Sequence, residues 1–185
     1  MRPAQFPHNV NTGTKDMMKH PHPWIVLLFA VWVLMAEHPA QAQNLTGPVV
    51  LTVDGSISRA DGAAIVKFDM AMLAALPSHV IKTQTPWTEG IQTFAGPLVA
   101  DVLKAAGATG TNFRAVAIND YGVDIPMVDI TSYPVILAIT HNDKKMSVRT
   151  KGPLWIIYPW GDNSAIRNEK YYNRSIWQLR KITVE

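Results

Sequence analysis

Residues 94–107, FAGPLVADVLKAAG, decide the fold class of this chain. They predict a helix over Pro97–Ala106, because proline opens the first turn, Leu98, Val102 and Leu103 share one face, and a glycine follows the last turn. This is one of only two segments with a clear helical pattern, so the remaining core has to be built mainly from strands.

The second predicted helix covers Met70–Leu76, with Asp69 as its N-cap and Pro77 as its stop. The segment 84–96 reads as a loop, and 162–173 reads as polar and partly helical. Short apolar or alternating runs predict strands at 49–53, 79–83, 113–118, 123–127, 134–140, 154–158 and 175–184. Two helices are too few to cover both faces of a parallel sheet, so the predicted class is α+β.

The N-terminus has the pattern of an export signal. Lys19 and His20 precede an almost wholly apolar run over 24–35, and Ala40-Gln41-Ala42 is typical of a cleavage site. The run is shorter than the roughly 20 residues that a spanning helix needs. We therefore expect a signal peptide over 1–42, a linker over 43–48, a domain over 49–185 and a periplasmic location.

Composition excludes several classes of function. The chain has no cysteine, and only His79 and His141 follow the predicted signal, which argues against a zinc site and a thiol nucleophile. No phosphate-binding glycine motif and no nucleophile elbow are present. The net charge is only +3, and no basic run in the predicted domain exceeds two residues, so nucleic acid is not an expected partner.

The most unusual loop is residues 83–90, TQTPWTEG, which combines hydroxyls, an acid and Trp87. A flat heterocycle needs such a mixture, namely an aromatic plate and a few directed polar groups. A pterin presents a guanidine-like edge that donates hydrogen bonds, and Glu89, Asp120 or Asp124 could accept them. The alternative is a capping loop in which Trp87 closes the core.

Two further segments are candidates for the same site. The turn 119–122, NDYG, contains Asp120 and Tyr121, although its composition also suits an ordinary turn. The strand over 154–158 is followed by PWGD, so its aromatic residues could form either core or a pocket wall. Arg149 and Lys151 precede it and are candidate anion contacts, with a solvated strand edge as the alternative.

Together these segments resemble the molybdopterin-binding domain of sulfite oxidase and its bacterial relatives, over roughly Val49 to Val184. The resemblance depends on the order and spacing of four marks. They are the tryptophan after a strand, FAGPL leading into DVL (94–103), the NDYG turn, and KGPLWIIYP (151–159), with IWQLRKI (176–182) as a fitting end. It implies a mixed, β-rich fold with short helices around a pterin pocket.

The chain departs from this family at the metal ligand. Active members hold molybdenum through a cysteine thiolate on the loop before the tryptophan, and the corresponding position here is at or near Thr83. A hydroxyl is a poor replacement for that soft ligand. Trp155 also stands where active relatives tend to carry a basic residue. We therefore expect a pocket suited to a pterin of the tetrahydropterin type without molybdenum.

Similar metal-free relatives look like periplasmic pterin-responsive regulators of a membrane-bound sensor that makes or breaks cyclic di-GMP, and the resemblance implies this role here. The residues expected to contact the pterin are Thr83, Thr85, Trp87, Glu89, Asp120, Tyr121, Tyr158 and Trp160. Two alternatives stay open. One is a molybdopterin-dependent oxidoreductase with an atypical ligand set, and the other is an interaction domain whose pocket is filled by Trp87, Trp155 and Trp160.

Overall fold

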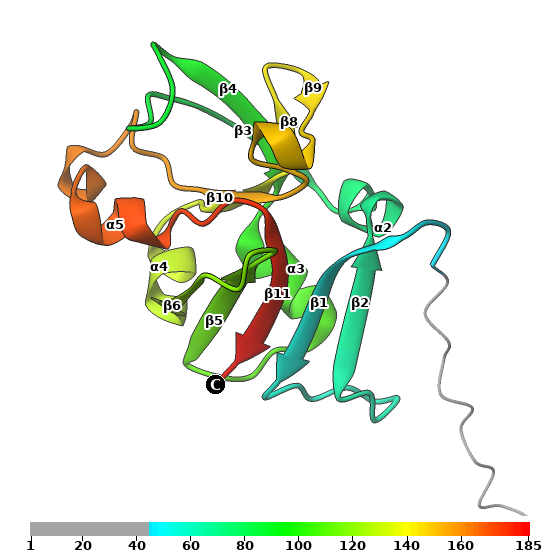
Figure 1. Ribbon diagram of the computed structural model, residues 1–185. Coiled ribbons are helices and arrows are strands. Elements are labelled where there is room, and N and C mark those ends of the chain that lie inside the picture. The colour runs from blue at the N-terminus through cyan, green and yellow to red at the C-terminus, as the bar shows by residue number, and fades with distance from the viewer. Residues whose placement is uncertain (1–44) are drawn as a thin grey trace, which may run out of the picture. The chain divides into compact units, whose positions relative to one another are not determined.

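A five-stranded mixed sheet has the strand order β2-β1-β11-β5-β6 (Figure 1). The central pair β1 and β11 is parallel, and the other pairs are antiparallel. In β1, Leu51 and Val53 alternate with more exposed residues and are fully buried, as expected for a strand with one face on the core. The strands are β1 (Val49–Gly55), β2 (Ile65–Asp69), β5 (Asn112–Ala117), β6 (Gly122–Pro126) and β11 (Leu179–Val184).

The structure is a computed structural model that describes residues 45–185. The predicted signal peptide over 1–42 and the first two residues of the predicted linker lie outside the described residues. Within the described part, no helix is both long and apolar enough to cross a bilayer.

A second group of strands covers the upper half of Figure 1. A four-stranded sheet has the order β3-β4-β8-β9, and β7 pairs with β10 beside it. The strands are β3 (Ser78–Thr83), β4 (Gln92–Pro97), β7 (Ile136–Ala138), β8 (Thr140–His141), β9 (Lys144–Lys145) and β10 (Trp155–Ile157). The expected loop over 84–96 is wrong at its end, because β4 begins at Gln92.

The described helices are all short. They are α2 (Met70–Ala75), α3 (Val99–Ala106), α4 (Met127–Ser132) and α5 (Glu169–Arg174), with the 3-10 turns η1 (Val148–Thr150) and η2 (Ser164–Ile166). The side chain of Asp69 accepts from the N–H of Met72 and caps α2, as predicted. Helix α3 begins two residues later than predicted, because Gly96 and Pro97 complete β4. Helix α4 was not predicted.

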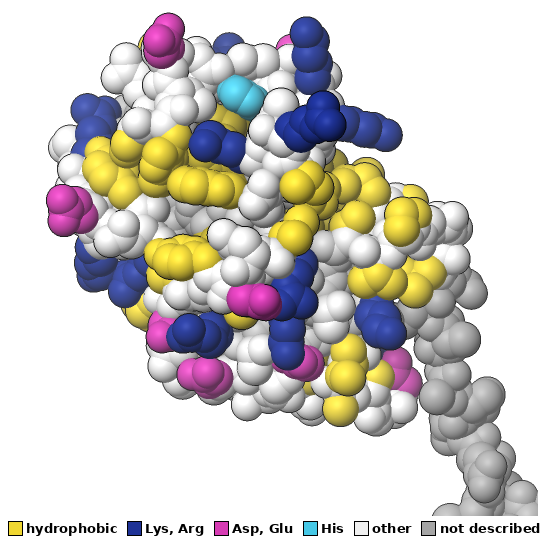
Figure 2. Space-filling view, in the orientation of Figure 1, with side chains coloured by type: hydrophobic (Ala, Val, Ile, Leu, Met, Phe, Trp, Pro, Cys, Tyr) yellow, Lys and Arg dark blue, Asp and Glu magenta, His cyan; other side chains and the backbone are white. Residues whose placement is uncertain are grey.

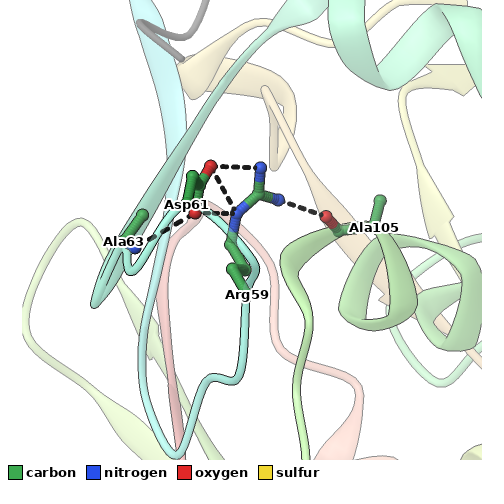
Figure 3. A network of polar contacts seen from close by, with 4 residues as sticks. All are labelled: Arg59, Asp61, Ala63 and Ala105. Carbon is green, nitrogen blue, oxygen red and sulfur yellow. Dashed lines mark hydrogen bonds and ion pairs between the residues drawn. The ribbon is translucent and has the colours of Figure 1, made fainter. Parts of the chain in front are cut away.

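The loop between β1 and β2 is fastened to the C-terminal end of α3 (Figure 3). Arg59 makes an ion pair with Asp61 at 2.8 Å and donates to the carbonyl of Ala105 at 3.0 Å. That carbonyl lies in the last turn of α3, where helix carbonyls lack an intrahelical partner. The contact therefore fixes the end of α3 relative to the β1–β2 edge of the five-stranded sheet.

Short strands in three sheets, joined by four short α-helices in the described part of the chain, confirm the predicted α+β class. The core contains side chains from both groups of strands and from α3, including Leu51, Phe94, Val102 and Trp155, all with 0% exposure. The residues of the candidate site are held in position by strand β4 and by the segment around Trp155.

Candidate functional site

Trp87 is presented by a hydroxyl-bonded turn directly after β3. The hydroxyl of Thr85 lies 2.8 Å from that of Thr88 and accepts from the N–H of Trp87 at 3.2 Å. Such bonds satisfy the backbone where the strand ladder ends. Thr83 and Thr85 are buried within this turn, whereas Glu89 lies beyond it and is exposed.

The ring of Trp87 contacts four other aromatic rings. Their centroids lie 5.2 Å (Trp177), 5.9 Å (Trp155), 6.3 Å (Trp160) and 6.3 Å (Tyr172) from its own. These partners come from β10, the loop after it, α5 and the segment before β11. Trp155 and Trp160 are buried, while the other three rings are half-buried. We call these five residues the aromatic cluster.

Two cavities border the aromatic cluster. The first, of about 340 Å³, is lined by Trp87, Tyr121, Tyr172 and Trp177, together with Asn119 and Asn173. The second, of about 610 Å³, is lined by Thr83, Thr85, Trp160 and Tyr172, with Lys82, Asp162 and Arg167 at its charged parts. Tyr172 belongs to both linings. Each volume lies in the range of known small-molecule sites.

The structure brings five of the eight predicted pterin contacts to these cavities. Trp87 and Tyr121 line the first cavity, and Thr83, Thr85 and Trp160 line the second. The tryptophans therefore pack on one another without closing the space beside them.

The other three predicted contacts lie elsewhere. Glu89 is exposed and lines neither cavity. Asp120 is also exposed, and its carboxylate pairs with Arg180. Tyr158 is fully buried, and its ring lies 6.0 Å from that of Trp160, so it supports the second cavity from behind.

The two candidate anion contacts differ in their surroundings. The ammonium of Lys151 lies 4.4 Å from the ring centroid of Trp177 and 5.7 Å from that of Trp155. It therefore makes cation–π contacts with the aromatic cluster. Arg149 is exposed on η1 and lines neither cavity.

The cavities are also lined by residues that the sequence patterns did not predict, among them Tyr172, Asn173, Trp177 and Arg167. Tyr172 and Asn173 lie on α5, in the segment that the sequence marked only as polar and partly helical. The available signal was the pair Tyr171-Tyr172, because adjacent aromatic residues are unusual in a solvated helix.

The indole N–H of Trp160 has no hydrogen-bond partner in the described structure, although Trp160 is only 2% exposed. Buried donors are nearly always paired, and leaving one unpaired is costly. Trp160 lines the second cavity, but its indole nitrogen is itself buried, so the unpaired donor lies within the packing of the aromatic cluster.

A buried polar network lies behind Trp160 and anchors α5. Tyr158 donates to Asp129 at 2.9 Å, and Arg174 donates to the same carboxylate oxygen at 2.7 Å. Burial raises the pKa of Tyr158 above its usual value, and the negative charge of Asp129 raises it further. The phenol is therefore a neutral donor, and the charge of Asp129 is balanced by Arg174.

The residues around Thr83 do not fit a molybdenum centre. The Thr83 hydroxyl donates to the carbonyl of Gln84 at 3.0 Å, and the chain has no cysteine. Within residues 45–185, no group of three or more His, Cys, Asp or Glu side chains is arranged to hold a metal ion. A soft thiolate ligand is therefore missing from the donor set.

The fold is the sulfite-oxidase-like α+β type that the resemblance implied. Among solved structures, the chain is similar to the sulfane dehydrogenase SoxCD from Paracoccus pantotrophus, with a TM-score of 0.54 and 17% sequence identity. The match covers 72% of this chain and 37% of that one, so the chain spans little more than a third of the neighbour's length. No protein-family model and no curated protein matches the sequence.

Proposed function

We propose that this chain is a periplasmic module that binds a reduced pterin without molybdenum and regulates a membrane-bound signalling partner. The two cavities of about 340 and 610 Å³ beside the aromatic cluster carry this proposal. A bicyclic ring with polar edges offers a flat apolar face to the aromatic rings and hydrogen-bonding groups to the polar lining residues.

The lining residues suggest how each edge of the ring would be bound. In the second cavity, the 4-oxo group or a ring nitrogen would accept from Lys82 or Arg167, while the amino-pyrimidine edge would donate to Asp162. Asp162 replaces the carboxylates considered from the sequence. Among those, Asp120 pairs with Arg180 and Asp124 pairs with Arg114 at 2.7 Å.

Two observations favour this role over the alternatives. A molybdenum oxidoreductase would need a soft ligand near Thr83, where the chain provides a hydroxyl that is already bonded to a carbonyl. A domain with a filled pocket would not retain cavities of about 340 and 610 Å³ beside the tryptophans.

Regulation requires that bound and free forms differ in their affinity for the partner. Helix α5 is suited to report binding, because Tyr172 and Asn173 line the cavities while no residue of the helix is fully buried. In this role a pterin contact on Tyr172 would reposition α5. The partner would be the periplasmic domain of a membrane-bound enzyme that makes or breaks cyclic di-GMP.

Anaerobic calorimetry with a tetrahydropterin tests the binding site. We expect measurable affinity in the wild type, and a loss of about ten-fold or more in Trp87→Ala. Trp160→Phe should also weaken binding, because it reduces the aromatic surface that lines the second cavity. Tyr133→Phe lies outside both linings and is the control.

Absence of binding, or equal affinity in Trp87→Ala and the wild type, contradicts the proposal. Metal analysis of protein exported in molybdenum-replete cells distinguishes this proposal from the oxidoreductase alternative. Stoichiometric molybdenum is the result expected for an oxidoreductase.

A further inference from the structure

An open apolar groove lies between α2 and β8, apart from both cavities. Its hollow measures about 350 Å³ and is lined mainly by Pro48, Met70, Ala71, Ala74 and Ile139. None of its lining residues lines either cavity at the aromatic cluster. The two alanines are exposed, so a flat, small-residue surface of α2 faces solvent.

Hydrogen bonds to the Asp69 carboxylate hold one side of the groove in place. The carboxylate of Asp69 accepts from the backbone N–H groups of Thr46 (2.6 Å), Gly47 (2.9 Å) and Met72 (2.8 Å). These bonds hold the chain before β1 against the start of α2. The carboxylate keeps its negative charge, but its oxygens are occupied by these donors within the protein.

One rim of the groove is basic. Lys145 lines the groove, and Lys144 precedes it in β9 with an exposed side chain. Asp143 is the acid of the same hairpin, and the exposed Arg149 follows on η1. Figure 2 shows Lys and Arg side chains gathered over β8 and β9, with hydrophobic side chains below them toward α2.

We propose that this groove docks an acidic, amphipathic helix of a protein partner. Its apolar face would cover Ala71 and Ala74, and its acidic residues would meet Lys144 and Lys145. The proposal depends on the proposed function only for the identity of the partner, a membrane-bound sensor.

Geometry favours this occupant over two others. An added strand would need a long edge, but the outer strand β9 has only two residues. A membrane surface would favour protruding apolar side chains, whereas these line a hollow.

The test uses a fluorescein-labelled helical peptide of about 18 residues, with leucine at the i, i+3, i+4 and i+7 positions and glutamate elsewhere. Anisotropy should show binding to the exported chain. The double variant Lys144→Glu/Lys145→Glu should weaken it about ten-fold or more, and Ala74→Gln, which fills the hollow, about five-fold. Lys104→Glu makes the same type of charge reversal on α3, at another exposed site, and should change the affinity less than two-fold.

Equal peptide affinity in the double variant and in Lys104→Glu overturns the proposal. So does a result in which phosphatidylglycerol vesicles bind through Lys144 and Lys145 while the peptide does not bind. Light scattering that finds a dimer dispersed by Ala74→Gln assigns the groove to a second copy and also overturns it. Tetrahydropterin affinity is measured on the same variants, and it should stay unchanged, so failure of the groove and failure of the pterin site are separately visible.

Discussion

Trp155 and Trp160 are both buried, but their indole N–H groups meet different surroundings. The N–H of Trp155 donates to the Ser175 hydroxyl at 3.0 Å, and that hydroxyl donates to the carbonyl of Ile156 at 2.6 Å. The N–H of Trp160 has no partner in the described residues. One tryptophan is therefore part of a closed hydrogen-bond network, whereas the other keeps an unpaired donor within the packing of the aromatic cluster.

This difference predicts unequal costs for the same substitution. Trp155→Phe breaks a buried hydrogen bond, so it should destabilise the fold by about 1–2 kcal/mol more than Trp160→Phe. Urea unfolding of both variants without ligand measures the difference. Equal destabilisation would mean that the Trp160 N–H is also paired within the protein.

Asp69 gives a prediction for acid stability. Backbone N–H groups, first that of Met72 and then those of Thr46 and Gly47, lower its pKa to about 2 from 3.8. A carboxyl with a lowered folded-state pKa stabilises the fold above its unfolded pKa and loses this contribution as pH falls. The stabilisation should therefore disappear between about pH 4 and pH 2.

Asp69→Asn keeps an N-cap but removes this titration, so melting temperature should vary less between pH 4 and pH 2 than in the wild type. Asp61 retains its own lowered pKa, mainly through hydrogen bonds from Arg59, and some pH dependence should remain. An unchanged slope in Asp69→Asn contradicts the assignment.

At the scale of single residues, the sequence predicted Trp87 and its neighbouring threonines better than the acids. Thr83 ends β3, and Thr85 and Trp87 follow in the next turn, so local chemistry was sufficient to place them together. The direction of Asp120 depends on Arg180, which is sixty residues away in the chain. Such long-range pairs leave no local pattern in the sequence.

Gly107 terminates α3 in a left-handed conformation, with φ of +76°. A Cβ at this position would lie 2.6 Å from the carbonyl oxygen of Ser58. Gly107→Ala should therefore destabilise the protein by about 2–3 kcal/mol, through strain and a steric clash. Gly62→Ala is the matched control, because its φ of +70° is similar but its surroundings are open. Equal effects on the unfolding free energy would show that backbone strain alone matters.

A nearly buried ion pair attaches helix α5 to α4, beside the ring contact of Tyr133 with Tyr171. Arg174 and Asp129 are 15% and 4% exposed at the side chain, so removing one partner leaves a nearly buried charge. Arg174→Met should cost about 3 kcal/mol and weaken tetrahydropterin binding through Tyr172. Lys170→Met, an exposed change on the same helix, is the control. Hydrogen exchange of the α5 amides should accelerate only in the first variant.

Among the helices and strands, capping residues and apolar spacing predicted the helices correctly, whereas glycine and proline predicted an element boundary in the wrong place. Both predicted helices form, since capping and apolar spacing act locally. The sequence placed Gly96 and Pro97 at the boundary between a loop and a helix, but they end strand β4 instead. A Cβ on Gly96 would collide with the carbonyl oxygen of Leu137. The glycine thus permits a close approach between strands that are distant in sequence, a reason that local rules cannot reveal.

Across the whole molecule, a packed series of rings runs from the basic hairpin to the aromatic cluster. His141 of β8 stacks on Phe94 at 4.7 Å, Phe94 lies 5.3 Å from Trp155, and Trp155 lies 5.9 Å from Trp87. Burial lowers the pKa of His141, so this series contains a neutral imidazole at neutral pH. The series therefore connects the aromatic cluster to β8, whose residue Thr140 lines the groove.

Such packing predicts a reciprocal coupling between the sites. Saturating tetrahydropterin should change the affinity for the acidic peptide by about five-fold, and saturating peptide should change the pterin affinity by the same factor, because both describe one coupling free energy. Phe94→Leu removes one ring from the series. In this variant, each ligand should change the affinity for the other by a factor closer to one. Phe113→Leu is the control, because Phe113 is equally buried but lies in the five-stranded sheet. Anisotropy and calorimetry on the three proteins measure the factors. If Phe94→Leu and Phe113→Leu reduce the coupling equally, the effect comes from general loosening of the core, and the ring series has no special part in it.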